Sequence, residues 1–225
     1  MTDDTLLTQL HQCINAINTG RLDILQKAFD DGRLPTNNIT LCEQAARKGH
    51  LHILQWLRAH NCKWDEWTCN RAVLHGHFHI LQWAHDNGCP WWKDEMCCRV
   101  VDSGNLNILK WLRIKGCPWN EDVCSNAAWF GNLTILKWAH ENGCPWNRRT
   151  YTNALKNKHW HIVKWLLENN YFQDSENFAW DSLQCLAWVH NYRHKQFQLK
   201  INSIHEILLH VINIPDIVNL IKSYL

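Results

Sequence analysis

The sequence lacks the features that mark several large classes of protein. Its 23 Lys and Arg nearly balance its 21 Asp and Glu, so no basic excess predicts a phosphate-gripping surface for nucleic acid. No apolar run approaches the roughly 18 residues of a membrane-spanning helix, and residues 1–5 are polar and acidic, unlike a signal segment. None of the 11 Cys belongs to a CxxC pair. We therefore expect a cytoplasmic protein with reduced thiols and no membrane contact, with the nucleus open as an alternative location.

Motifs for catalysis and for metal binding are also missing. The sequence contains no GxSxG, no glycine loop for phosphate and no recurring pair of carboxylates. The Cys residues are spread one per turn or helix, and no four-ligand set with the short spacing of a zinc site can be written. We predict no enzyme, no catalytic residue, no cofactor and no metal. A lone Cys–His dyad stays open as an alternative, but nothing in the sequence selects one.

The sequence does contain a repeat of about 27 residues. Glycines recur at separations of 29, 27, 28 and 27 residues, and Lys158 opens a sixth unit 27 residues later. Tryptophan and cysteine recur in phase with them. The columns are Gly20, Gly49, Gly76, Gly104 and Gly131; Trp56, Trp83, Trp111, Trp138 and Trp165; and Cys13, Cys42, Cys69, Cys97 and Cys124. The single 28-residue step comes from one extra residue in Pro90-Trp-Trp-Lys93. Such phasing predicts stacked structural repeats.

Each unit is predicted to hold two helices. After each glycine, apolar residues follow at helical spacing until a Gly-Cys-Pro stop, as at Gly116. Asp65, Asn120 and Asn147 are suitable N-caps for the first helix of the next unit. No segment alternates with period two. We therefore predict an all-α solenoid of stacked helix-turn-helix repeats, in which the tryptophans of helices and turns pack as a continuous ladder.

The units at the two ends are irregular. The opening pair, residues 4–31, has Lys27 in the tryptophan column, which suits a solvent-facing cap. After Asn170 the pattern decays into a degenerate seventh unit. We assign residues 1–192 to the solenoid, with six helix pairs and this remnant. Residues 193–225 form a helical cap or tail, whose amphipathic end from residue 203 is broken at Pro215.

The repeat resembles the ankyrin family. The stretch Cys124-x-x-Ala-Ala-x-x-Gly131-Asn-Leu-x-Ile-Leu-x-Trp-Ala-x-x-x-Gly143 is similar to the ankyrin pattern L-x-x-A-A-x-x-G-H-x-x-V-V-x-L-L-x-x-x-G. The resemblance of the repeats as a whole covers roughly residues 4–170. Ankyrin units are about 33 residues long. The T-P-L-H start and about six residues are missing here, and both losses fall in the β-hairpin finger. The resemblance thus implies ankyrin-like repeats lacking that finger.

The Trp-rich, GCPW-containing units further resemble short ankyrin-like repeat proteins of giant DNA viruses. That resemblance implies an adaptor or a protein that interacts with the host. Residues 214–225 are similar to the first helix of an F-box, which implies recruitment of a ubiquitin ligase; a terminal capping helix explains the same residues equally well.

Three columns of the first helix vary from unit to unit while the core columns stay constant. They lie two residues before, and two and five residues after, the Cys or Tyr column, so they share one helical face. In ankyrin-like stacks this helix lines the concave side, and solenoids bind partners there. We predict partner-binding residues Trp67, Arg71, Leu74, Glu95, Arg99, Asp102, Asp122, Asn126, Trp129, Arg149, Asn153 and Lys156.

The expected partner is a protein bound by a monomeric adaptor. Exposed aromatic residues favour this reading, because they are enriched at interaction hot spots. An RNA-binding helical repeat is the alternative, favoured by a basic cluster around Tyr151 and Trp160 that comprises Arg148, Arg149, Lys156, Lys158 and Lys164. Acidic residues on the same face would repel phosphates, so we do not expect nucleic acid as the partner.

Overall fold

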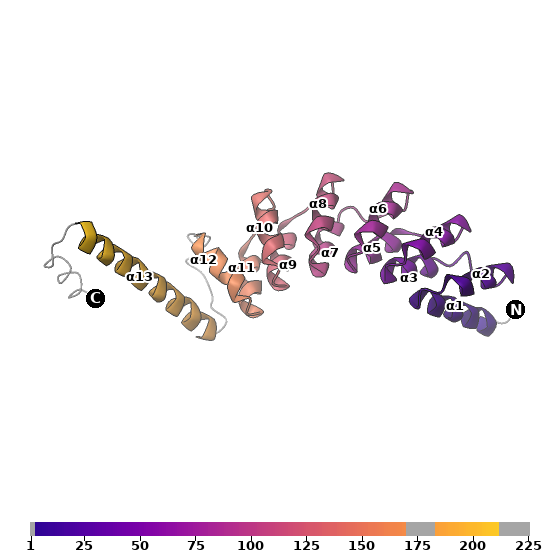
Figure 1. The fold of residues 1–225 in the computed structure, drawn as a ribbon, viewed down its shortest axis with the longest axis horizontal. Helices are drawn as coiled ribbons and strands as arrows, with labels where there is room; N and C mark the ends of the chain where they lie inside the picture. Colours follow the sequence, from indigo (N-terminus) through magenta and orange to yellow (C-terminus); the bar gives the residue numbers. More distant parts are fainter. Residues whose placement is uncertain (1–2, 170–182, 212–225) are drawn as a thin grey trace. The chain divides into compact units, whose positions relative to one another are not determined.

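The structure, a computed structural model, describes residues 3–169 and 183–211. Within these ranges the chain forms thirteen α-helices and no strand, so the prediction of an all-α repeat fold is confirmed (Figure 1). The helices are α1 Asp3–Asn18, α2 Leu22–Asp30, α3 Thr40–Lys48, α4 Leu51–Ala59, α5 Glu66–Leu74, α6 Phe78–Asp86, α7 Met96–Ser103, α8 Leu106–Ile114, α9 Glu121–Trp129, α10 Leu133–Glu141, α11 Arg148–Lys156, α12 Trp160–Glu168 and α13 Leu183–Val211.

Residues 3–169 form six helix pairs, from α1/α2 to α11/α12. Each odd-numbered helix from α1 to α11 packs against its even-numbered partner, and those from α1 to α9 also pack against the next odd-numbered helix. Successive even-numbered helices approach one another less closely, and they lie together on one side of the odd-numbered helices (Figure 1). Small residues explain the difference, because Ala45, Ala72 and Ala127 in the first helices are fully buried and let neighbouring backbones lie close.

The helix ends follow the predicted caps and stops. The side chains of Asp65, Asn120 and Asn147 accept hydrogen bonds from the backbone N–H two residues on, at 3.0, 3.1 and 2.8 Å, which satisfies one of the free donors at each helix start. The second helices α2, α4, α6, α8 and α10 are each followed by a left-handed residue. Asn61 takes this conformation at φ 59° in place of the usual glycine, because the short polar side chain of Asn tolerates it.

Tryptophans join consecutive units in pairs. The tryptophans of three turns each lie against the second-helix tryptophan of the following unit, with ring centroids about 6 Å apart. The pairs are Trp64–Trp83 at 5.8 Å, Trp91–Trp111 at 6.2 Å and Trp119–Trp138 at 5.7 Å. Cations and histidines cover the turn indoles, with Arg58 4.1 Å above the Trp64 ring and His85 5.4 Å from that of Trp91. The structure therefore groups the indoles by junction, rather than in one continuous ladder.

The chain divides into two compact units, Met1–Tyr171 and Phe172–Leu225. In the second unit, α13 continues without interruption through residue 192, where the sequence suggested the end of the solenoid. The break expected at Pro215 and the F-box-like segment 214–225 lie outside the described residues, as does most of the first half of the degenerate seventh unit.

Candidate functional site

The three variable columns of the first helices reach solvent in the structure. We call their twelve predicted residues in the third to sixth units the first-helix stripe. Each of the twelve is exposed or half-buried, whereas the Cys or Tyr column and the columns one residue before and three and four after it are buried. The stripe comprises Trp67, Arg71 and Leu74 on α5, Glu95, Arg99 and Asp102 on or beside α7, Asp122, Asn126 and Trp129 on α9, and Arg149, Asn153 and Lys156 on α11.

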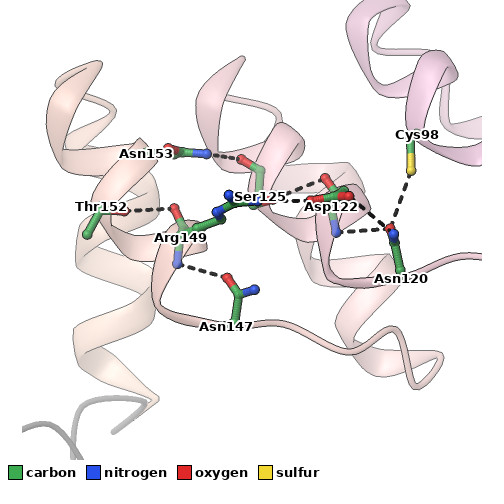
Figure 2. A network of polar contacts seen from close by, with 8 residues as sticks. All are labelled: Cys98, Asn120, Asp122, Ser125, Asn147, Arg149, Thr152 and Asn153. Carbon is green, nitrogen blue, oxygen red and sulfur yellow. Dashed lines mark hydrogen bonds and ion pairs between the residues drawn. The ribbon is translucent and has the colours of Figure 1, made fainter.

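Polar side chains of the stripe connect neighbouring first helices. Arg71 Nε lies 2.7 Å from Glu43 Oε1 of the preceding unit, in an ion pair that is only partly exposed. Arg149 Nη1 lies 3.5 Å from Asp122 Oδ1, and Asn153 Nδ2 donates to the Ser125 carbonyl at 2.9 Å (Figure 2). These residues thus help to hold successive units in register while their outer edges remain accessible.

The start of α9 is organised by Asn120. Its side-chain oxygen accepts from the Asp122 N–H at 3.1 Å and lies 3.5 Å from the Cys98 thiol, which belongs to the preceding unit (Figure 2). Asn147 repeats the capping contact one unit later with Arg149. The same cap position therefore satisfies a backbone donor at the start of both α9 and α11.

An aromatic–arginine cluster occupies the N-terminal ends of α5 and α7. The rings of Trp67 and Trp92 meet edge to face, with centroids 4.6 Å apart. The Arg71 guanidinium lies 5.3 Å from the Trp67 ring and that of Arg99 lies 5.4 Å from the Trp92 ring. Trp67 is 36% exposed. Sequence reasoning missed Trp92; the signal that could have found it was the single inserted residue in the turn before α7.

Trp129 belongs to a different part of the stripe. It is the last residue of α9 and is 46% exposed, whereas Trp67 stands near the start of α5, and α7 lies between the two helices. Phe130, 45% exposed, follows it directly. The variable columns predict Trp67 and Trp129 on one face, and the structure places them at opposite ends of that face. The stripe thus carries two separate aromatic patches.

The recurring cysteines are buried among the helices. Burial raises the pKa of Cys42 to about 12 and that of Cys62 to about 11. A hydrogen bond with Cys89, together with burial, raises the pKa of Cys69. A thiol with a raised pKa stays protonated at neutral pH and is a poor nucleophile. Cys42, Cys62 and Cys69 therefore act as small apolar groups that fill the junctions between helices.

The histidines at the glycine junctions make contacts between units. His77 Nε2 donates to the Arg47 carbonyl at 3.0 Å, and His159 Nε2 donates to the Trp129 carbonyl at 2.8 Å. Asn132 does the same at an equivalent position, donating to the Val101 carbonyl at 2.8 Å. Since Asn can replace His in this column, the contact requires a donor rather than a metal ligand. Over residues 3–169 and 183–211, no three His, Cys, Asp or Glu side chains converge as a metal site would require.

Comparison with protein families adds to this picture. Residues 41–85, which run from α3 to near the end of α6, match a family model described as ankyrin repeats (many copies). The repeats are ankyrin-like. Ankyrin repeats are generally protein–protein interaction modules and bind protein partners, and the family is typically composed of scaffolds rather than enzymes. None of the curated proteins searched matches the chain. No helix in the described part of the chain has the length and apolarity needed to cross a membrane.

Proposed function

We propose that this protein is a non-catalytic scaffold that holds a protein partner on its first-helix stripe. The observation that carries the proposal is the cluster of Trp67, Trp92, Arg71 and Arg99. Tryptophan and arginine are the residues most enriched at interaction hot spots. Here two indoles and two guanidinium groups stand together at the surface of a stack whose core columns merely repeat.

The charges of the stripe support a protein partner rather than RNA. Glu95, Asp102 and Asp122 stand on the same face as the arginines and would repel phosphates. Tyr151, which the RNA-binding alternative would use for stacking on bases, is 4% exposed. A protein surface with both signs of charge could complement this mixed stripe, and such complementarity improves specificity and the association rate.

The more specific form of the proposal is an adaptor. The resemblance to short ankyrin-like proteins of giant DNA viruses supports a role in the host cytoplasm, where the stack would capture a host protein. The similarity of residues 214–225 to an F-box helix supports delivery of that partner to a ubiquitin ligase. Both elements of this role rest on sequence resemblance.

The decisive experiment compares partner capture by two sets of variants. Trp67→Thr with Trp92→Ser should abolish capture of the protein that the wild type retains from nuclease-treated host-cell lysate. The fold should survive, because the residue equivalent to Trp67 in the second unit is Thr40 and Trp92 lies in the turn that carries the inserted residue. Trp129→Ala tests the other aromatic patch separately. Circular dichroism and the unfolding midpoint provide the control for folding.

Three outcomes would contradict the proposal. Loss of the captured species after nuclease treatment would indicate a nucleic-acid partner. Unchanged capture by both sets of folded variants would place the partner on another surface. Unfolding of the Trp67/Trp92 variant would show that these indoles stabilise the stack instead of presenting a binding site.

A further inference from the structure

The second helix of the fourth unit, α8, differs in charge from its equivalents. Near its end it carries Lys110, Arg113, Ile114 and Lys115, with no acidic residue. The position of Ile114 holds an acid in four other units, namely Asp30, Asp86, Glu141 and Glu168. This unit therefore gains positive charge and an apolar side chain where four other units carry a negative charge.

An open pocket of about 460 Å³ lies beside this helix. Its walls are Lys110, Arg113 and Ile114 of α8, Trp119 of the following turn, and Trp138 and Asn142 at α10. The Trp119 and Trp138 rings meet edge to face at 5.7 Å and form its apolar wall. The Asn142 amide donates to the Trp138 carbonyl at 2.7 Å, so its side-chain oxygen remains as an acceptor.

The cations of this pocket are positioned by the indoles. The Arg113 guanidinium lies 4.0 Å from the Trp119 ring and donates to the Cys117 carbonyl. Lys110 Nζ lies 5.8 Å from the Trp138 ring. Lys115 does not line the pocket, and its Nζ lies 5.3 Å from the Trp111 ring. In the part of the chain that the structure describes, none of the three forms an ion pair with a carboxylate. The pocket thus has two positive charges, Lys110 and Arg113, that no carboxylate pairs.

Ile114 gives the pocket an apolar edge. Its side chain is 82% exposed, the largest value among the exposed large apolar residues of the described chain. Burial of such a side chain by a partner would favour binding, because it removes apolar surface from water. Unpaired cations beside an uncovered aliphatic group and two indoles match a ligand that is both anionic and apolar.

We propose that this pocket binds an acidic peptide segment of a protein, with an apolar side chain covering Ile114 and Trp138 and carboxylates facing Lys110 and Arg113. The pocket lies on the second helices, apart from the first-helix stripe, and the inference does not depend on the function proposed for that stripe. The phosphates of a nucleic acid would also pair with these cations. A nucleic acid would leave Ile114 without an apolar contact, so an acidic peptide is the ligand that fits the pocket better.

The repeat itself supplies variants that the fold tolerates. Lys110→Gln, Arg113→His and Ile114→Glu each introduce the residue that another unit carries at the same position, for example Gln82, His140 and Glu141. Lys137→Gln removes the same charge as Lys110→Gln from the next unit, outside the pocket. It is the matched control for non-specific attraction.

The probe is a fluorescein-labelled nine-residue peptide of Asp and Glu around one central Leu, measured by fluorescence anisotropy against the whole chain at low salt. Lys110→Gln and Arg113→His should each weaken binding about two- to fivefold, as expected for partly exposed charge pairs. Ile114→Glu should weaken it at least about tenfold, because it adds repulsion and removes the apolar contact. Raising the salt should weaken binding of the wild type, and Lys137→Gln should change little.

Several results would overturn the proposal. Equal losses of peptide affinity in Lys137→Gln and Lys110→Gln would show that binding depends only on the overall charge of the protein. Equal affinity for a peptide with Gly in place of Leu would remove the apolar part of the site. Tighter binding of a labelled oligothymidylate, lost in Ile114→Glu, would assign the pocket to nucleic acid. Absence of peptide binding by a folded wild type would dismiss the site.

Discussion

At the scale of single residues, the junction between units depends on a fit between one glycine and one ring. The His159 ring lies over Gly131, and a Cβ placed on that glycine would approach its Cε1 and Nδ1 to 2.8 Å. The same ring donates to the Trp129 carbonyl. Gly131 therefore serves two purposes: its φ of 77° ends the first helix of the fifth unit, and its missing side chain leaves room for the next unit.

Gly131→Ala and Gly143→Ala should separate these two purposes. Both residues have nearly the same positive φ, 77° and 78°, but nothing lies within 4 Å of a Cβ at Gly143. We expect Gly143→Ala to cost about 1 kcal/mol for the left-handed conformation. Gly131→Ala should cost about 2 kcal/mol, because the ring must also move and weaken its hydrogen bond. Urea unfolding measures both, and equal losses would show that the ring adapts freely.

At the scale of helices, cohesion between consecutive second helices depends on side chains rather than on close backbones. Trp111 of α8 illustrates this, because its ring lies 6.2 Å from Trp91, 5.1 Å from His85 and 6.1 Å from Phe78, all of the preceding unit or turn. The Trp111 indole thus supplies side-chain contacts between α6 and α8, whose backbones do not approach each other closely. Trp129 at the end of α9 lacks this role, since nearly half of it is exposed.

Trp111→Ala should therefore destabilise the stack far more than Trp129→Ala. Removal of a half-buried indole with three aromatic neighbours should lower the free energy of unfolding by about 2–3 kcal/mol, less than the 3–5 kcal/mol of a fully buried ring. Trp129→Ala should cost under about 1 kcal/mol. Denaturant unfolding followed by far-UV circular dichroism compares the two. Similar losses would mean that Trp129 also packs within the stack.

At the scale of the whole stack, the histidine-rich junctions connect stability to pH. The pKa of His50 is lowered by burial and by the neighbouring His52, His77 and Lys48. A histidine whose pKa is lower when folded binds fewer protons folded than unfolded at mildly acidic pH. Its stabilising contribution is therefore complete above the unfolded pKa of about 6.5 and falls as the pH drops below that value.

We expect the melting temperature to fall when the pH is lowered from 7.5 to 5.5, and His50→Asn to reduce that fall. Asparagine is a matched replacement, because Asn105 and Asn132 occupy the same column in later units. Differential scanning calorimetry across this range gives the comparison. An identical pH profile for the variant would remove His50 from the explanation.

Sequence alone determined the periodic features of this protein. The phased glycines, the Asp65, Asn120 and Asn147 caps and the helical spacing of apolar residues fixed the helix ends, because these depend on contacts within a few residues. The same spacing separated buried columns from the solvent-facing stripe. For that reason the all-helical repeat stack and the exposure of the candidate site could both be predicted.

Tertiary structure decided what crosses from one unit to the next. The meeting of Trp92 with Trp67, the separation of Trp67 from Trp129 and the pocket between α8 and α10 all depend on how consecutive units are rotated and spaced. A repeat pattern records which residues are equivalent, but it contains no distance between side chains of different units. The contacts of the inserted residue in the turn before α7 are another such feature, because only the folded chain shows which side chains its indole meets.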